Sequence, residues 1–268
     1  MQQQTPASPA LLQELGDALY SALRERRTLA PLSERYALSV EDAYRISLRF
    51  LARRESDGER VIGKKIGVTS KPVQDMLGVH QPDFGFLTDA MQYENGASVS
   101  LRASGLMQPR AEGEIAFMLK HDLQGPGVTA ADVLAATAWV APCFEIVDSR
   151  IDNWRIKIAD TVADNASCGV FVVGPQRTDP LSLDLAQVSM HMWKNGTPAG
   201  QGLGSAVQGH PAEAVAWLAN TLGAFGIPFK AGELILSGSL APLVPAQAGD
   251  RFHMTIEGLG ECSVAFTE

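Results

Sequence analysis

Ala111-Glu112-Gly113-Glu114-Ile115-Ala116-Phe117-Met118-Leu119 has the pattern of a β-strand that carries two carboxylates in an otherwise apolar run. Side chains at i and i+2 of a strand share a face, so Glu112 and Glu114 point the same way, with Cα atoms about 6–7 Å apart. The alternate side chains, from Ile115 to Leu119, point into a core. Burying a carboxylate is costly unless a positive group neutralises it. The pair therefore lies either on the solvent-exposed face of a strand or in a cation site.

A second apolar run, Trp139-Val140-Ala141-Pro142-Cys143-Phe144-Glu145-Ile146-Val147, carries one more isolated carboxylate. This run is too apolar for an ordinary exposed strand, which favours a buried role for Glu145. Three carboxylates from two strands suit a hard divalent cation such as Mg²⁺ or Mn²⁺ and leave positions for water or substrate. We therefore expect Glu112, Glu114 and Glu145 to bind one metal ion.

Composition limits the classes of protein to consider. The 268 residues can form one large domain, or one domain with a small appendage. The net charge of −8, without a basic run, argues against a nucleic-acid partner. No apolar run is long enough for a membrane span, and the first residues lack signal-peptide character. Three widely spaced cysteines favour a reducing, cytoplasmic location over a disulfide framework.

Periodicity divides the chain near residue 60. Leu and Ala recur at helical spacing from Leu11 to Leu23, and Ser39 with Asp42 can cap a second helix. From Val61 onward, short β-like runs alternate with Gly, Pro and Asn. We expect a helical section over 1–60 and a β-rich catalytic domain over 61–268, an α+β fold. The strand candidates are 61–68, 97–101, 111–119, 138–147, 168–173, 187–194, 233–237, 251–257 and 261–266.

Predicted turns and helices separate the strand candidates. Asn195-Gly196 and Gly258-Leu259-Gly260 predict hairpin turns. One helix is expected after Thr129, and another has Pro211 in its first turn, where the preceding His210 can cap it. The five histidines show no metal-ligand spacing, and the chain has neither a phosphate loop nor a Gly-x-Ser-x-Gly elbow.

Three further segments carry groups that could take part in chemistry. Lys64 and Lys65 lie in an apolar strand, where an inward lysine needs a carboxylate or an anionic ligand and an outward one extends to water. Gln81-Pro82-Asp83-Phe84-Gly85 reads as a turn, whose Asp83 could transfer protons if it folds over a site. The polar run Asp160 to Ser167 also reads as a turn on composition alone.

Together these segments resemble the fumarylacetoacetate hydrolase superfamily, in particular its bacterial hydratase and decarboxylase branch from catechol meta-cleavage pathways. The matching stretches are Lys65-Ile66-Gly67-Val68-Thr69-Ser70, Gln81 to Gly85, Gln108-Pro109-Arg110-Ala111-Glu112-Gly113-Glu114, Glu145 to Ile151, Asp160 to Gly169, Gly209-His210-Pro211 and Ala248-Gly249-Asp250. They follow one another along nearly the whole chain. The run Asp160 to Gly169 is most similar to the 2-hydroxypenta-2,4-dienoate hydratases of that branch. Ala111 and Gly113 are smaller than the residues that relatives often have there, but neither is a ligand position.

The resemblance implies a β-rich mixed roll or barrel of the fumarylacetoacetate hydrolase C-terminal type, with a small helical N-terminal section, assembled as a homo-oligomer. It implies Mg²⁺ or Mn²⁺ as the cofactor of the three glutamates. It also implies catalytic roles for two residues, Lys65 and Asp83, and substrate contacts for four others, Asp164, Asn165, Ser167 and Ser239.

The implied activity is addition of water to 2-hydroxypenta-2,4-dienoate (2-oxopent-4-enoate), giving 4-hydroxy-2-oxopentanoate. The alternative is decarboxylation of 2-oxo-3-hexenedioate (4-oxalocrotonate), which needs the same metal and a cationic group for a distal carboxylate. The sequence leaves open whether Arg110, Arg150 or Lys157 reaches that far end. A third interpretation is a non-catalytic partner subunit of such a decarboxylase, and the presence of all three glutamates argues against it. The resemblance also allows a complex with a pathway enzyme.

Overall fold

The computed structural model describes residues 7–268, apart from the side chains of Pro72 and Met76. The expectation about the first residues therefore lies outside the described part of the chain. Within the described part, none of the helices combines the length and the apolar character needed to cross a bilayer.

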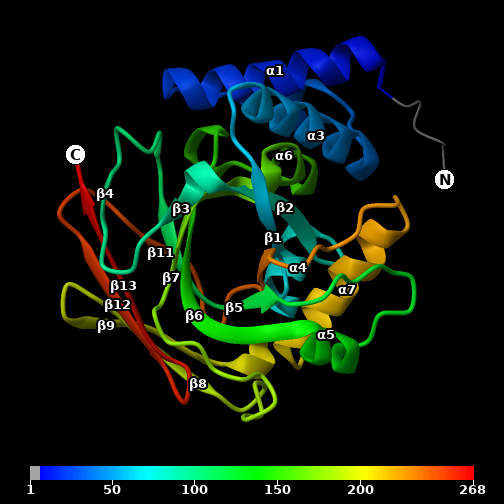
Figure 1. Cartoon of the computed structure of the whole chain (residues 1–268). Coiled ribbons are helices and arrows are strands. Elements are labelled where there is room, and N and C mark those ends of the chain that lie inside the picture. Colours follow the sequence, from blue (N-terminus) through cyan, green and yellow to red (C-terminus); the bar gives the residue numbers. More distant parts are fainter. Residues whose placement is uncertain (1–6) are drawn as a thin grey trace.

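Three helices precede the first strand and form a layer at one end of the molecule (Figure 1). They are α1 (Pro9–Glu25), α2 (Leu32–Arg35) and α3 (Val40–Ser56). Ser39 and Asp42 form the expected capping box, in which each side chain bonds the other residue's backbone N–H. The apolar faces of α1 and α3 bury Leu19, Ile46 and Phe50 against α6 (Ile158–Ala163). This helical layer thus supports the segment that leads into Asp164.

The larger sheet has the strand order β2-β1-β10-β5-β6-β7-β3, and β11 pairs with β5. Figure 1 shows this sheet curling around a central space, as an open barrel. Its strands are β1 (Val61–Gly67), β2 (Asp83–Thr88), β3 (Gln92–Tyr93), β5 (Arg110–Leu119), β6 (Thr137–Val147), β7 (Cys168–Val173), β10 (Leu234–Leu236) and β11 (Val244–Pro245). The concave face carries a small apolar cluster that includes Ala116, Cys143 and Leu236.

A second sheet packs against the outside of β6 and β7, with the order β4-β13-β12-β8-β9. Its strands are β4 (Ser98–Ser100), β8 (Ser189–Lys194), β9 (Thr197–Leu203), β12 (Arg251–Ile256) and β13 (Gly260–Thr267). The hairpin turns predicted at Asn195-Gly196 and around Leu259 connect β8 to β9 and β12 to β13. The main core lies between the two sheets and includes Phe117, Phe144 and Phe252.

Two helices cover the remaining side of the barrel, α5 (Ala130–Ala136) and α7 (Pro211–Gly223). His210 caps α7 as expected, because its Nδ1 accepts a hydrogen bond from Ala212 N–H at 3.0 Å. The short helix α4 (Lys71–Leu77) connects β1 to β2.

All nine strand candidates are strands, so the α+β fold with a β-rich barrel is confirmed. The turn predicted at Asp83 is wrong, because Asp83 is the first residue of β2 and pairs with Gly67 of β1. The polar run from Asp160 is only partly a turn: its first half continues α6, and Asn165–Ser167 form a single 3-10 turn before β7. Neither difference affects the prediction of the barrel. Both concern segments near the glutamates, the strand that carries Asp83 and the loop before β7.

Candidate active site

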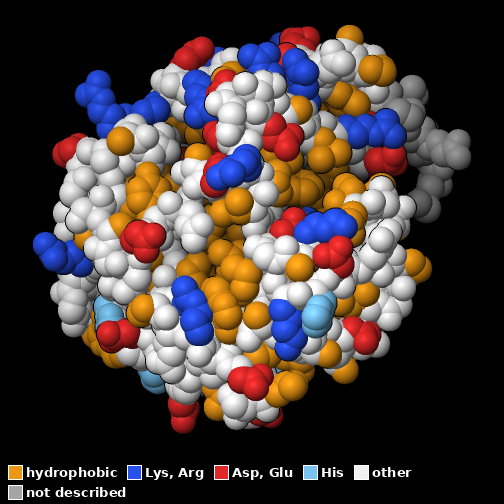
Figure 2. Space-filling model, viewed as in Figure 1, with side chains coloured by type: hydrophobic (Ala, Val, Ile, Leu, Met, Phe, Trp, Pro, Cys, Tyr) orange, Lys and Arg blue, Asp and Glu red, His pale blue; other side chains and the backbone are white. Residues whose placement is uncertain are grey.

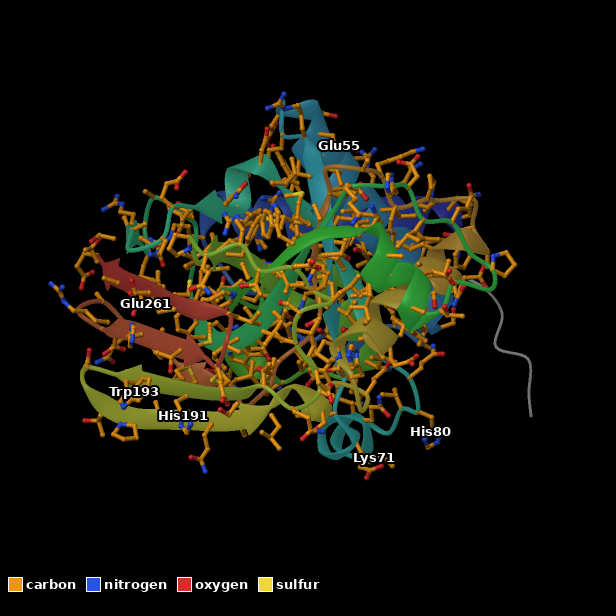
Figure 3. The ribbon with its side chains drawn as sticks, turned by 60° about the horizontal axis from the view of Figure 1, so that its bottom comes forward. Glu55, Lys71, His80, His191, Trp193 and Glu261 are labelled. Atoms are coloured by element: carbon orange, nitrogen blue, oxygen red, sulfur yellow. The ribbon has the colours of Figure 1, made fainter. Side chains whose placement is uncertain are left out.

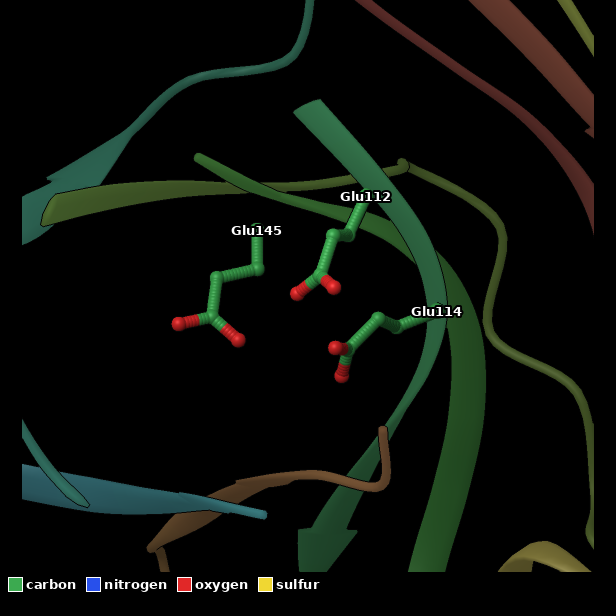
Figure 4. A group of neighbouring side chains, drawn as sticks. All are labelled: Glu112, Glu114 and Glu145. Atoms are coloured by element: carbon green, nitrogen blue, oxygen red, sulfur yellow. The ribbon is translucent and has the colours of Figure 1, made fainter. Parts of the chain in front are cut away.

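Glu112 and Glu114 lie on β5, and Glu145 lies on the antiparallel neighbour β6. In this ladder Glu112 faces Glu145, and Glu114 faces Cys143. Strand alternation therefore directs all three carboxylates to the concave face of the sheet. One carboxylate oxygen of each residue lies within 4.8 Å of the others, and Figure 4 shows the three groups converging. The structure brings together the three residues that the sequence singles out.

These carboxylates occupy a buried environment with few partners. Glu114 and Glu145 are fully buried. Gly238 N–H donates to Glu114 Oε2 at 2.9 Å, but among the described residues Glu114 Oε1 and Glu145 Oε2 have no hydrogen-bond partner, and Glu145 Oε1 has only an ion pair with Lys65. Burial and the charge of Glu145 raise the pKa of Glu112 to about 8, and they raise the pKa of Glu114 well above its ordinary value. Such a cluster is costly without a cation, and its all-oxygen donor set suits a hard divalent one.

Lys65 is the cationic group beside this cluster. Its Nζ lies 3.0 Å from Glu145 Oε1, and both side chains are buried. Burial opposes the charge of Lys65, but the carboxylates of Glu145 and Asp83 outweigh it and raise the lysine pKa. The neighbouring Lys64 points to the other face, where it pairs with Glu233. Both lysines are thus buried, but only Lys65 reaches the glutamates.

Asp83 lies next to Lys65 across the β1–β2 ladder, where Lys65 faces Gly85 and Gly67 faces Asp83. Its Oδ1 has no hydrogen-bond partner among the described residues. Burial raises the pKa of Asp83 to about 6, although the charge of Lys65 opposes the shift. A Cβ at Gly67 would lie 2.3 Å from Asp83 Oδ1, so this carboxyl needs glycine opposite it. A carboxyl group that titrates near neutrality, aimed at an acidic cluster, is suited to proton transfer.

The loop before β7 is held by its own side chains. Arg150 Nε donates to Asp164 Oδ1 at 2.5 Å, and Arg150 N–H donates to Asp164 Oδ2 at 2.8 Å. Asn165 exchanges two hydrogen bonds with the backbone of Phe86 on β2. Asn165, Ala166 and Ser167 all have positive φ, a conformation that costs energy in residues other than glycine. The structure thus uses Asp164 and Asn165 to fix a strained loop beside the barrel.

The Ser237-Gly238-Ser239 segment follows β10 and contacts the glutamate cluster at Glu114. Ser239 Oγ donates to Ala241 O at 2.6 Å. Ser237 Oγ is buried and has no hydrogen-bond partner among the described residues. Gly238 has a φ of 110°, which favours glycine and lets its N–H reach Glu114.

Histidines take no part in the cluster. Among the described residues, the three glutamates form the one group of acidic, histidine or cysteine side chains with metal-ligand spacing. Figure 3 shows His80 beside the α4 segment that carries Lys71, and His191 with Trp193 on β8 of the second sheet. The oxygen-only cluster therefore remains the candidate metal centre.

Residues 61–267 match the family model described as fumarylacetoacetate (FAA) hydrolase C-terminal. The chain belongs to this family. The match begins at the first strand and covers every residue of the glutamate cluster, Lys65 and Asp83, so the resemblance read from the sequence is confirmed.

Several characterised family members are similar over nearly their whole length. The chain is 78% identical to 2-hydroxyhexa-2,4-dienoate hydratase of Comamonas testosteroni, over 94% of this chain and 96% of that protein. It is 63% identical to 2-hydroxypent-2,4-dienoate hydratase of Pseudomonas putida, over 81% of this chain and 98% of that protein. Among solved structures, 4-oxalocrotonate decarboxylase from Pseudomonas putida G7, complexed with magnesium and adipate, superposes with a TM-score of 0.94 at 32% identity, covering 98% and 100% of the two chains.

Sequence reasoning missed several groups around the glutamate cluster. Cys168 is buried as expected of a core residue, but it also lies close to Glu145, since burial and then the charge of that carboxylate raise its pKa. The Gly238 N–H and the Arg150–Asp164 pair were also missed. A Ser-Gly-Ser segment and a lone arginine give no signal of these contacts, because each depends on a partner far away in the chain.

Proposed function

We propose that this chain is a hydro-lyase that adds water to 2-hydroxypenta-2,4-dienoate, or to its six-carbon homologue, and forms the corresponding 4-hydroxy-2-oxo acid. The observation that carries the proposal is the convergence of three carboxylates, Lys65 and Asp83 in a chain so similar to two named dienoate hydratases. We propose the degradation of aromatic compounds by meta-cleavage as the context, as the family resemblance implies.

We further propose that Glu112, Glu114 and Glu145 hold Mg²⁺ or Mn²⁺. Glu114 Oε1 and Glu145 Oε2, which are buried without partners, fit a divalent ion, which would balance the carboxylate charge that the single Lys65 leaves over. When bound, the ion would supply Lewis-acid polarisation of the carboxylate and 2-oxygen of the substrate.

Asp83 and Lys65 are the groups that this chain offers for moving protons. The reaction removes the 2-hydroxyl proton and adds one at C5, and water then gives its hydroxyl to C4 and a proton to C3. Asp83, whose pKa of about 6 allows both protonation states near neutrality, accepts and returns a proton in these steps. Lys65 stays positively charged, fixes Glu145 and stabilises negative charge that develops on the substrate.

Asp164, Asn165, Ser167 and Ser239 remain predictions as substrate-binding residues. The contacts of Asp164 and Asn165 favour an indirect role, because their side chains hold the loop and bond the strand that carries Asp83. Ser167 Oγ lies 3.2 Å from Thr161 Oγ1 and retains the capacity for a further hydrogen bond.

The decarboxylase alternative needs a free cation for a second carboxylate. Arg150 does not fill that role, because its guanidinium is occupied by Asp164 and the Cys168 carbonyl. Arg110 lies 4.4 Å from the Trp154 ring centroid. The preference for hydration of a monocarboxylate rests on the similarity to two named dienoate hydratases.

The proposal also covers the oligomeric state of the protein, its cellular location and its domain bounds. We propose a homo-oligomer in the cytoplasm, with residues 1–60 as a helical section and 61–268 as the catalytic domain. Support comes from three buried free cysteines, which suit a reducing compartment, and from the helices that end at Ser56, just before β1.

A spectrophotometric assay tests the proposal. The dienol's ultraviolet absorbance should decline only with Mg²⁺ or Mn²⁺ present, and Glu114→Gln should reduce turnover by orders of magnitude. Glu261→Gln is the matched control, because Glu261 is a surface residue of β13 (Figure 3). Carbon dioxide release from the six-carbon diacid, without hydration of the dienoate, would support the decarboxylase instead. Near-normal metal-dependent turnover by Glu114→Gln would remove the metal assignment.

A further inference from the structure

A second enclosed space lies away from the glutamates. This cavity of about 230 Å³ is bounded by the C-terminal end of α1, the loop after β4, β3 and the start of β7. Its lining, drawn from the described residues, includes neither Lys65 nor Asp83 nor any of the three glutamates. It therefore contains none of the proposed metal-binding or catalytic residues, although Cys168, which lies close to Glu145, is part of its wall.

Arginines dominate the wall of this cavity. Five of them line it, against two carboxylates, Glu59 and Asp148; the arginines are Arg24, Arg26, Arg54, Arg102 and Arg150. The excess of positive charge is unusual in a chain with a net charge of −8. Figure 2 shows Lys and Arg side chains gathered along the upper and upper-left edge of the molecule, where Figure 1 places α1 and the loop after β4.

Several of these guanidinium groups retain unused hydrogen-bond donors. Arg24 and Arg54 share Glu59, at 2.9 and 2.8 Å, and Arg24 also pairs with Asp57 at 2.5 Å. Arg26 makes one hydrogen bond, to Leu106 O at 3.1 Å. For Arg102, no ion pair or side-chain hydrogen bond is found within the described residues 7–268. An arginine has five N–H donors, so the cavity offers many more donors than its own acceptors can use.

Two of the arginines are buried, which makes the site more than a patch of surface charge. Arg54 is 7% exposed and Arg150 is 1% exposed. Burial and the nearby charge of Arg150 lower the pKa of Arg54, although Glu59 opposes the shift. Glu59 already pairs with Arg54 and Asp164 with Arg150, so the charge left for a ligand comes from Arg26 and Arg102 at the same cavity.

Asp148 provides an unpartnered polar atom in the same wall. It is 1% exposed, and its Oδ1 accepts hydrogen bonds from Met107 and Gln108 N–H. Its Oδ2 has no partner among the described residues. Burial raises the pKa of this carboxyl, although the charge of Arg150 opposes the shift.

We infer that this cavity binds a small oxyanion with at least two negative charges, either a phosphate or a dicarboxylate. Guanidinium groups match both anions through paired N–H donors. The cavity is smaller than the roughly 300–1,000 Å³ of sites for larger organic ligands, which argues against a nucleotide. The inference is independent of the proposed hydratase activity, because it involves none of the proposed catalytic residues.

Titration of the magnesium-loaded protein with inorganic phosphate, and separately with succinate, tests this inference. Thermal unfolding and calorimetry are followed at an ionic strength held constant with NaCl, because salt alone screens surface charges. We expect saturable binding and a rise in Tm with at least one of the two anions, and the stronger one identifies the ligand's chemistry. The double variant Arg26→Gln, Arg102→Gln should bind about ten-fold more weakly or worse.

The matched control is the double variant Arg60→Gln, Arg155→Gln, which removes the same charge from exposed arginines outside the cavity. It should bind like the unaltered protein. Glu114→Gln should also retain binding, which separates this site from the metal centre. The inference is overturned if neither anion binds saturably, if both double variants lose affinity equally, or if Glu114→Gln abolishes binding.

Discussion

Adding Mg²⁺ to the metal-free protein at pH 7 should release protons, and their number follows from the buried carboxylates. The pKa of Glu112 is raised to about 8, so this group is about nine-tenths protonated at pH 7. Burial and the charge of Glu145 raise the pKa of Glu114 well above its ordinary value. Metal ligands must be deprotonated. We therefore expect about one proton to be released from Glu112 for each ion bound, and an affinity that rises with pH.

Calorimetry in buffers of different ionisation enthalpy measures this number directly. Glu112→Gln should remove about one of the released protons and weaken Mg²⁺ binding, because glutamine keeps the shape but cannot supply a charge. Glu261→Gln, on the surface, should change neither quantity. Binding without proton release, or with the same release in Glu112→Gln, would refute the account of a repulsive buried cluster.

Three further predictions concern the groups around the cluster. Arg150→Met should destabilise the protein by about 3–5 kcal/mol in urea unfolding, because buried Asp164 loses its partner, whereas Arg155→Met at an exposed pair should cost little. Gly67→Ala should lower kcat about ten-fold or more in a folded protein, since its Cβ would displace the Asp83 carboxyl; an unchanged kcat would contradict this. Asp83 is a carboxylate above its pKa of about 6, so kcat/KM should fall as the pH falls through about 6. A bound cation should move this fall to a lower pH. Asp83→Asn should abolish the acidic limb of the pH profile.

Local pattern was enough to predict most of the elements. The strand runs around Glu114 and Glu145 have apolar alternation that only a buried sheet explains, and both are strands of the barrel. The cap formed by Ser39 and Asp42 depends on residues three apart, so the sequence shows it directly. The glutamate cluster could be predicted because Glu112 and Glu114 share one face of an apolar strand and Glu145 stands alone in a second apolar run.

The remainder depends on contacts between distant segments. The strand at Asp83 was predicted as a turn because Pro82 and Gly85 favour turns locally, and pairing with β1 overrides that preference. Asp164 looked like a turn residue, but its partner is Arg150 on a different segment. The cavity lined by arginines combines residues from Arg24 to Arg150, and no local window contains it.

The most direct test of the central claim is a crystal structure of the protein soaked with Mn²⁺, read from its anomalous signal. The account predicts one strong peak about 2.1 Å from one carboxylate oxygen each of Glu112, Glu114 and Glu145. No peak at that position, or a peak bound by other residues, would contradict it.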